Sequence, residues 1–578
     1  MNESHSGASF DGCWSAVAQF LRAAHVSDVF GLPSDDLTAL AELSSAGVRM
    51  VVCRDQRNAM HMATGYAQRL GKPAVCIVGK GPAVSNLVTG LLEAATSRTP
   101  VLVLAVSTPP DRQHAGAFQD CDQLAMVRAT VKRALRVDDA GRVPAVLQQA
   151  WSAASSGAPG PVFVEFGEQL LSAAIPPPVS WAIGPERTEG FVPPADSAAL
   201  ALLGQASRPL IVVGGGARRA DAGAAVLELA EMIGAGIVCT ASGRGAVDET
   251  HTQFLGLVGL YGRPVVTELL ASTDLVISIG SRLEETATVG WPVPASTPVI
   301  QVNIAADDCL HEFCGPVVEG DAGAVIGAWT RELKVGDPGG RLDPGWTAGI
   351  ANCRSLLFEE SATTVWEQQR EPGIKIAELL WALRSATSTD ITLVQENGLL
   401  DMWTYFFPYF LASQGDRVVA PSEQTALGFG AAAAVGAGVA APDVPVVAVV
   451  GDGAFTMFAA DLPTAAENRA GVVYLVLCNG GYGWLQAEAD AHGTDDYRFA
   501  DPQRPLPLIS AAGVSTVTVL DKNKMLDQLT TAIDLAAEGE VVVALVPTDL
   551  ADMPPGIADF VNGTERVAQT VAQTPPKE

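Results

Sequence analysis

The sequence predicts an α/β protein built from three doubly wound parallel sheets. Short apolar runs of strand length alternate with longer helical stretches along most of the chain, which is the pattern of strand–helix–strand units. This pattern breaks twice, at Pro- and Gly-rich stretches over 176–194 and around 337–346. A chain of 578 residues is also too long for one hydrophobic core and suggests about three domains.

Each expected domain contains several apolar runs of the length and β-branched content of buried parallel strands. We expect a first domain over 1–175, a central domain over 195–335, a third domain over 370–555 and a polar tail over 556–578. The expected strands of the first domain cover 29–31, 49–53, 74–78, 101–105 and 162–166. Those of the central domain, whose pattern repeats that of the first, cover 210–213, 236–239, 275–279 and 299–302. Those of the third cover 391–396, 444–450 and 472–478.

Charge and cysteine content indicate which partners and which cellular compartment to expect. The formal net charge is −28 and no basic block occurs, so we expect no nucleic acid and no membrane among the partners. The nine cysteines are scattered singly, without a Cys-x-x-Cys pair, and are interpreted as reduced core residues. The first residues lack the basic and apolar regions of a signal peptide, so a cytoplasmic location is expected.

The most informative stretch is Gly451-Asp452-Gly453, at the end of the apolar run 444–450. A second apolar run ends at Asn479, so both polar side chains fall at carboxyl ends of strands, where open parallel sheets bind ligands. Carboxylate and amide oxygens are hard ligands that suit Mg²⁺ or Ca²⁺, and Mg²⁺ usually adds phosphate oxygens and water. A lone Gly-Asp-Gly turn is also an ordinary loop.

Asn479 follows Asp452 by 27 positions, and in this spacing the segment resembles the thiamine-diphosphate motif of the acetolactate synthase-like family. By that resemblance, Asp452, the Asn479 side chain and the Gly481 carbonyl hold Mg²⁺ against the cofactor's diphosphate. The family also implies a bulky apolar residue beneath the cofactor, here Leu427, although a core would supply one too. The remaining cofactor-binding positions implied by the resemblance are Thr425, Gly451, Gly453 and Ala454.

Motifs in the first domain extend the resemblance to the family's pyrimidine-binding domain. They match it in order and spacing at Phe30-Gly31-Leu32-Pro33, Gly65-Tyr66-Ala67-Gln68, Gly81-Pro82-Ala83-Val84-Ser85-Asn86 and Ala117-Phe118-Gln119-Asp120. Phe118 and Gln119 match positions that border the active-site channel of relatives, which makes them candidate catalytic residues. Core packing is the alternative for Phe118.

One candidate catalytic residue departs from the family. A Glu nine residues before the Gly of the Gly-Tyr-Ala motif activates the cofactor in relatives, and counting back from Gly65 gives Gln56. An amide donates a hydrogen bond to the ring but cannot shuttle its proton. If the strand over 49–54 runs on, the neighbouring Asp55 points to the opposite face and is no simple substitute.

The sequence of the central domain does not identify its ligand. Its glycine-rich turns resemble those of family members that bind FAD, but they serve equally as plain turns, and FAD is the less favoured alternative. Four arginines of this domain are candidates for contacting a nucleotide or coenzyme A, or for simple solvation: Arg218, Arg219, Arg244 and Arg282.

The resemblance implies an enzyme that uses thiamine diphosphate and Mg²⁺ to cleave or form a carbon–carbon bond beside a carbonyl of a small-molecule substrate. Decarboxylation of a 2-oxo acid followed by carboligation is the leading reaction. A 2-hydroxyacyl lyase and a non-catalytic or regulatory paralogue are the alternatives. The family's shared active site implies a homodimer or homotetramer.

Overall fold

A computed structural model of the chain describes residues 9–32, 37–183, 197–335 and 342–494, and near its C-terminal end 509–510, 512, 514, 516–554 and 556–557. Several sequence predictions lie outside these residues: Pro33, the later part of the expected linker over 184–194, the start of the second break over 337–341, and the tail beyond 557.

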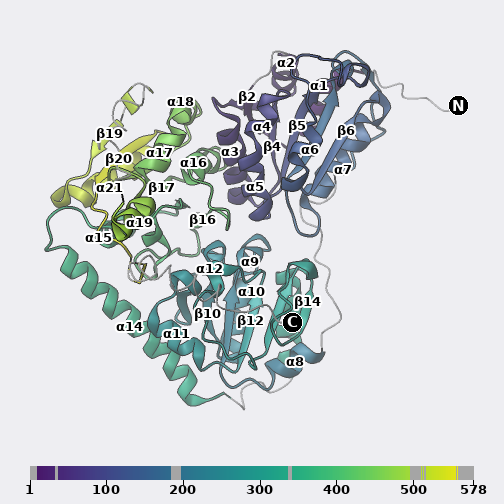
Figure 1. Cartoon of the computed structure of the whole chain (residues 1–578). Coiled ribbons are helices and arrows are strands. Elements are labelled where there is room, and N and C mark those ends of the chain that lie inside the picture. The colour runs from purple at the N-terminus through teal and green to yellow at the C-terminus, as the bar shows by residue number, and fades with distance from the viewer. Residues whose placement is uncertain are drawn as a thin grey trace.

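The structure is α/β, with three six-stranded sheets whose neighbouring strands are all parallel (Figure 1). Helices cover the faces of each sheet, as parallel sheets require. A two-stranded antiparallel pair, β1 (Phe10–Asp11) with β8 (Ala174–Ile175), joins the two ends of the first unit. The prediction of three doubly wound parallel sheets is therefore confirmed.

The first sheet has the strand order β3-β2-β4-β5-β7-β6. Its strands are β2 (Asp28–Leu32), β3 (Arg49–Val52), β4 (Ala74–Val78), β5 (Val101–Ser107), β6 (Arg133–Val137) and β7 (Val162–Gly167). The helices around it are α1 (Gly12–Ala23), α2 (Thr38–Ser45), α3 (Gln56–Leu70), α4 (Pro82–Asn86), α5 (Val88–Thr96), α6 (Gln123–Val127) and α7 (Val143–Ser155).

The second sheet has the strand order β11-β10-β9-β12-β13-β14. Its strands are β9 (Pro209–Val213), β10 (Gly236–Cys239), β11 (Phe254–Leu257), β12 (Leu275–Ile279), β13 (Val299–Asn303) and β14 (Val317–Glu319). Its helices are α8 (Ser197–Leu203), α9 (Gly215–Arg219), α10 (Gly223–Ile233), α11 (Pro264–Ala271), α12 (Glu285–Thr288) and α13 (Ala322–Val335).

The third sheet has the strand order β16-β15-β17-β18-β20-β19. Its strands are β15 (Thr392–Gln395), β16 (Arg417–Val419), β17 (Val446–Gly451), β18 (Val472–Cys478), β19 (Thr516–Val519) and β20 (Val542–Pro547). Its helices are α15 (Ile376–Ala386), α16 (Phe429–Ala440), α17 (Asp452–Phe458), α18 (Leu462–Glu467), α19 (Gly483–His492) and α21 (Met525–Ala537).

Strand order separates the central sheet from the other two. Numbered along the chain, the first and third sheets both follow the order 2-1-3-4-6-5, whereas the central sheet follows 3-2-1-4-5-6, the order common among dinucleotide-binding folds. The sequence pattern is the same in all three units because it reflects only the alternation of strands and helices. That alternation does not determine the order in which the strands pair.

The first and third units share one hydrophobic core through α3 and α16. A Cβ on Gly65 of α3 would lie 2.2 Å from the Ala433 carbonyl oxygen, and one on Gly436 of α16 would lie 1.8 Å from that of Met62. These separations are far below contact distance, so the helices pack backbone against backbone. Polar contacts flank the core, including the Asn58 amide, which donates to the Asp461 carboxylate at 2.8 Å.

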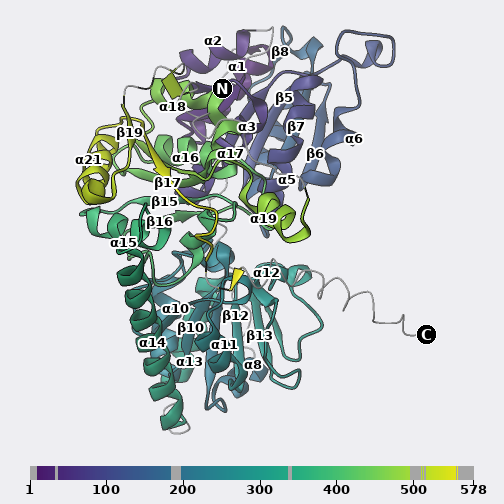
Figure 2. The same ribbon diagram turned by 60° about the vertical axis from the view of Figure 1, so that its left-hand side comes forward.

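A long helix, α14 (Pro344–Gln368), runs along the outside of the central unit and leads to the third unit, as both views show (Figure 2). No helix within the described residues combines the length and apolar character needed to cross a bilayer.

All nine cysteines are free thiols. Six are buried, as the sequence predicts, but Cys121 and Cys314 are exposed and Cys478 is half-buried. The core interpretation is therefore wrong for Cys121 and Cys314, which lie in loops, whereas Cys478 packs against the core that the first and third units share.

Candidate functional site

The site begins where β17 and β18 end. The two strands pair in parallel from Val446 opposite Val472 to Gly451 opposite Leu477. Asp452, the first residue of α17, and Asn479, just beyond β18, therefore emerge at the same edge of the sheet. This edge adjoins the switch point between β15 and β17, where the strand order reverses and open α/β sheets bind ligands.

Asp452 is fully buried, yet only one of its carboxylate oxygens has a partner. Oδ2 accepts a 2.8 Å hydrogen bond from the Gly480 amide, whereas no described residue donates to Oδ1. Burial raises the pKa of Asp452 to about 6, against the lowering effect of hydrogen bonds from nearby backbone amides. A buried carboxylate oxygen without a donor is costly, which is the condition that a bound cation relieves.

A small cavity, lined by the residues on either side of Asp452, collects most of the predicted cofactor residues. Its lining includes Leu427, Gly451, Gly453, Ala454, Asn479 and Gly481. A Cβ on Gly453 would lie 2.9 Å from the Tyr482 ring, so only glycine fits there. Asn479 presents an amide oxygen that accepts from the Gly481 amide at a long 3.4 Å, which leaves it available as a ligand.

The same cavity is lined by Asp401, a residue that sequence reasoning missed. Asp401 is buried, its Oδ2 has no partner among the described residues, and burial raises its pKa to about 7. Two incompletely bonded carboxyl groups therefore lie close together here: Asp401 lines the cavity, and Asp452 lies between the lining residues Gly451 and Gly453. The only sequence signal is an acidic residue at the head of the aromatic stretch 401–410.

Two buried glutamates hold the loop that carries Thr425 and Leu427. Glu93 of α5 accepts from the Ala426 amide at 3.1 Å and from the Ser422 amide. Glu396, beyond β15, accepts from the Gly430 amide at 2.8 Å and from the Gly428 amide at 3.2 Å. The loop held by these hydrogen bonds places Leu427 in the lining of the small cavity.

Thr425 itself adopts a left-handed conformation in this loop, with φ of 47°. Its carbonyl oxygen accepts from the Asn397 side chain at 3.4 Å. It is not among the residues that line the small cavity.

Gln56 is the first residue of α3, and β3 ends at Val52. The strand therefore does not run on to Asp55. Instead, Asp55 caps α3 through Oδ1, which accepts from the Arg57 amide at 2.8 Å and the Asn58 amide at 3.3 Å, so the side chain is held at the start of the helix. Gln56 Oε1 accepts a 2.9 Å hydrogen bond from the Asn86 side chain.

Phe118 and Gln119 lie on an exposed loop beside the Gly81 turn. The Phe118 side chain is 69% exposed, so the core-packing alternative is wrong for it. The Lys80 ammonium lies 6.0 Å from the centre of its ring, and Gln119 has a left-handed φ of 57°. Neither residue, nor Gln56, lines the cavity at Asp452 within this single chain.

The four central arginines divide into two groups. Arg244 is buried and paired with Glu249 at 2.8 Å, so it is neither solvated nor free for a phosphate. Arg282 pairs with Glu284. Arg218 and Arg219 instead line a cavity against the other two units.

Comparisons with known proteins agree with this geometry. Residues 14–126 match the thiamine pyrophosphate enzyme N-terminal TPP binding domain, 197–326 match the central domain, and 396–545 match the C-terminal TPP binding domain. The three matches follow one another in that order and together cover more than half of the chain.

Full-length relatives include acetolactate synthases. The isozyme 2 large subunit of Escherichia coli (strain K12) is 28% identical over 94% of this chain and 97% of its own length. The acetolactate synthase of Arthrospira platensis is 29% identical over 85% of this chain and 86% of its own length. A probable acetolactate synthase large subunit of Methanococcus aeolicus is 26% identical over 96% and 95% of the two chains. The chain therefore belongs to the thiamine pyrophosphate enzymes and, among them, is acetolactate synthase-like.

Proposed function

We propose that this enzyme binds thiamine diphosphate with Mg²⁺ and decarboxylates a 2-oxo acid, passing the remaining acyl group to an acceptor. The observation that carries the proposal is the buried, unpartnered Asp452 Oδ1, on the residue between Gly451 and Gly453, which line a cavity together with Asn479 and Leu427. The family membership and the acetolactate synthase relatives support the same reaction class.

The metal would be held by Asp452 Oδ1, the Asn479 side-chain oxygen and the Gly481 carbonyl. All are hard oxygen donors, and a site with one carboxylate leaves positions for phosphate oxygens and water, as Mg²⁺ prefers. The described residues contain no cluster of three or more His, Cys, Asp or Glu suited to another kind of metal site. Leu427 would support the cofactor from below. When bound, the cofactor supplies an electron sink for breaking the bond next to the carbonyl.

Gln56 would position the cofactor without moving a proton. Its Oε1 is engaged by Asn86, which leaves its amide nitrogen to donate to a ring nitrogen. The cap on α3 holds the Asp55 side chain at the start of that helix, which argues against Asp55 as the group that moves the proton.

A complete site would need two chains. Gln56, Phe118 and Gln119 belong to the first unit and do not line the cavity at Asp452 of the same chain. We propose a homodimer or homotetramer in which the first unit of one copy closes over the third unit of another. The high exposure of Phe118 supports a surface that another chain covers.

Gln56 also favours a second candidate, a paralogue that binds the cofactor without turnover. The two candidates are separated by assaying the purified protein with a panel of 2-oxo acids, with and without thiamine diphosphate and Mg²⁺. Cofactor-dependent CO₂ release that is lost in Asp452→Ala supports the enzyme. Tight cofactor binding with no release from any 2-oxo acid supports the paralogue.

A further inference from the structure

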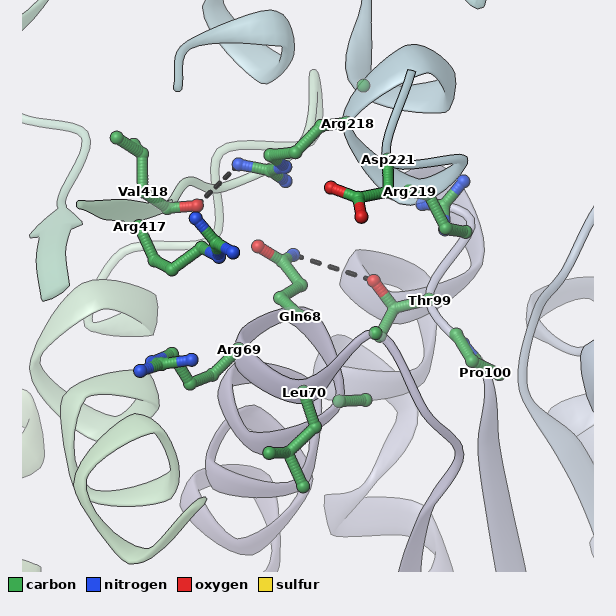
Figure 3. A pocket seen from close by; sticks show the side chains of 13 residues that line it. Gln68, Arg69, Leu70, Thr99, Pro100, Arg218, Arg219, Asp221, Arg417 and Val418 are labelled. Carbon is green, nitrogen blue, oxygen red and sulfur yellow. Dashed lines mark hydrogen bonds between the residues drawn. The ribbon is translucent and has the colours of Figure 1, made fainter. Parts of the chain in front are cut away.

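A second cavity, of about 290 Å³, lies where the three units meet, and four arginines line it (Figure 3). Arg69 comes from the end of α3, Arg218 and Arg219 from α9, and Arg417 from the start of β16. The guanidinium groups of Arg218 and Arg417 face the same space above Gln68, while Arg219 lies on the opposite side, beside Thr99 (Figure 3). Each unit thus contributes at least one cation to the cavity.

The arginines are bonded only to neutral oxygens. Arg69 donates to the Thr392 hydroxyl at 2.9 Å, Arg219 to the Ser97 carbonyl at 2.9 Å, and Arg218 to the Val418 carbonyl. Arg417 donates to the Asp416 carbonyl at 3.1 Å. Within the described part of the chain none of the four forms an ion pair, whereas Arg244, Arg282 and Arg384 all do.

Charge in this cavity is unbalanced. Its one carboxylate, Asp221, faces the cavity from the central unit, which leaves three positive charges unmatched (Figure 3). Burial, reinforced by Arg417, lowers the pKa of Arg218 to about 10. Burial and the neighbouring arginines lower that of Arg219 to about 9. Asp390, outside the lining, offsets part of the charge of Arg69, and Arg417 is exposed to solvent. The lining still holds more cations than carboxylates, and this excess of like charge opposes the folded state.

We propose that this cavity binds a multivalent oxyanion of the phosphate type, which bridges the three units. The planar fork of a guanidinium suits the oxygen geometry of phosphate, and several arginines around one cavity suit an ion with more than one negative charge. The ion bonds to Arg218 and Arg417 and receives a further hydrogen bond from Gln68, whose amide now donates to Thr99 at 3.5 Å and to Ala420 at 3.3 Å.

The oxyanion site is separate from the cofactor site, because the two cavities share no lining residue. It lies at the opposite end of α3 from Gln56. The proposal therefore does not depend on the reaction assigned above, and failure of either leaves the other standing.

The test uses the full-length protein saturated with thiamine diphosphate and Mg²⁺, so that the cofactor's own diphosphate site is filled. Thermal unfolding is followed while inorganic phosphate is added, with NaCl at equal ionic strength as the control. We expect phosphate to raise Tm by about 2 °C or more beyond the effect of NaCl. A parallel titration uses glucose 6-phosphate. If this ester does not raise Tm, the site takes free phosphate only; if it does, the site accepts phosphate monoesters.

Variants at the cavity sharpen the test. Arg417→Gln should weaken phosphate binding about tenfold in calorimetry and, by relieving repulsion, leave Tm without phosphate equal or higher. Asp221→Asn should tighten binding, and Asn accepts the φ of 54° found at this position.

Arg331→Gln, at an exposed arginine of α13, is the matched control and should bind as wild type does. A phosphate effect no larger than that of NaCl, or equal binding in Arg417→Gln and Arg331→Gln, would overturn the proposal.

Discussion

Asn86 donates a hydrogen bond of 2.9 Å to the side-chain oxygen of Gln56. The two residues belong to different helices, α4 and α3, and the bond fixes which end of the Gln56 amide points away from Asn86. A donor, rather than an acceptor, is therefore left free on the side chain that we propose contacts the cofactor.

Gln56→Glu should restore that transfer. A carboxylate keeps an acceptor for Asn86 and adds a group that carries a proton, so exchange of the bound cofactor's thiazolium proton should speed up by roughly 10²-fold. Acid-quench NMR of proton–deuteron exchange measures this rate. Gln414→Glu, at an exposed glutamine, is the control and should change nothing. Equal rates in wild type and Gln56→Glu would show that Gln56 does not contact the cofactor.

Asp452→Ala should abolish Mg²⁺-dependent cofactor binding. The substitution removes Asp452 Oδ1, the buried oxygen that lacks a donor. Without this ligand, the Mg²⁺ that would hold the cofactor's diphosphate is lost. Calorimetric titration of thiamine diphosphate, with and without Mg²⁺, gives the affinities. Asp443→Asn, at an exposed carboxylate, should bind like wild type. Undiminished affinity in Asp452→Ala would sink the metal assignment.

His61 should make the protein sensitive to acid. It is fully buried on α3 against the Phe429 ring, and neither ring nitrogen has a partner among the described residues. Burial, and to a lesser degree Arg57, lowers its pKa to about 3. The folded state thus binds fewer protons than the unfolded chain, whose histidine titrates near 6.5, so stability is lost as pH falls below about 6.5.

His61→Leu should remove this loss, which amounts to about 2 kcal/mol between pH 7 and pH 5. Urea unfolding of wild type and variant at the two pH values measures the difference. His25→Asn, at an exposed histidine, should keep the wild-type dependence. If His61→Leu loses as much stability on acidification as wild type, His61 is not buried as a neutral ring.

The shared site predicts complementation between inactive chains. Asp452→Ala disables the third unit, and Gln56→Lys should block the first by placing an ammonium group where the cofactor ring binds. Mixed dimers then carry one intact site, so co-expression should recover about a quarter of wild-type activity, where either variant alone has none. Light scattering gives the assembly state, and an active, cofactor-loaded monomer would contradict the proposal. Because two relatives are named large subunits, the measurement also shows whether a second kind of chain copurifies.

The sequence predicted those strands and site residues that can be recognised from their immediate neighbours along the chain. Long buried strands such as β17 and β18 are made of apolar residues, and Asp452 and Asn479 follow these two strands directly. Edge strands such as β6, with its exposed Arg133, lack that signal and were missed. Asp401 was missed because its role depends on burial beside Asp452, which neighbouring residues in the sequence do not encode. The exposure of Phe118 likewise depends on what packs around it.

The contact of α3 with α16 has a mechanical consequence. Where Gly65 meets Ala433 and Gly436 meets Met62, the two backbones touch without side chains between them. Such a joint cannot slide or open in small steps, because any separation leaves a gap that no rotamer fills. The first and third units of one chain therefore move as a single block, and access to the site cannot come from a hinge between these two units.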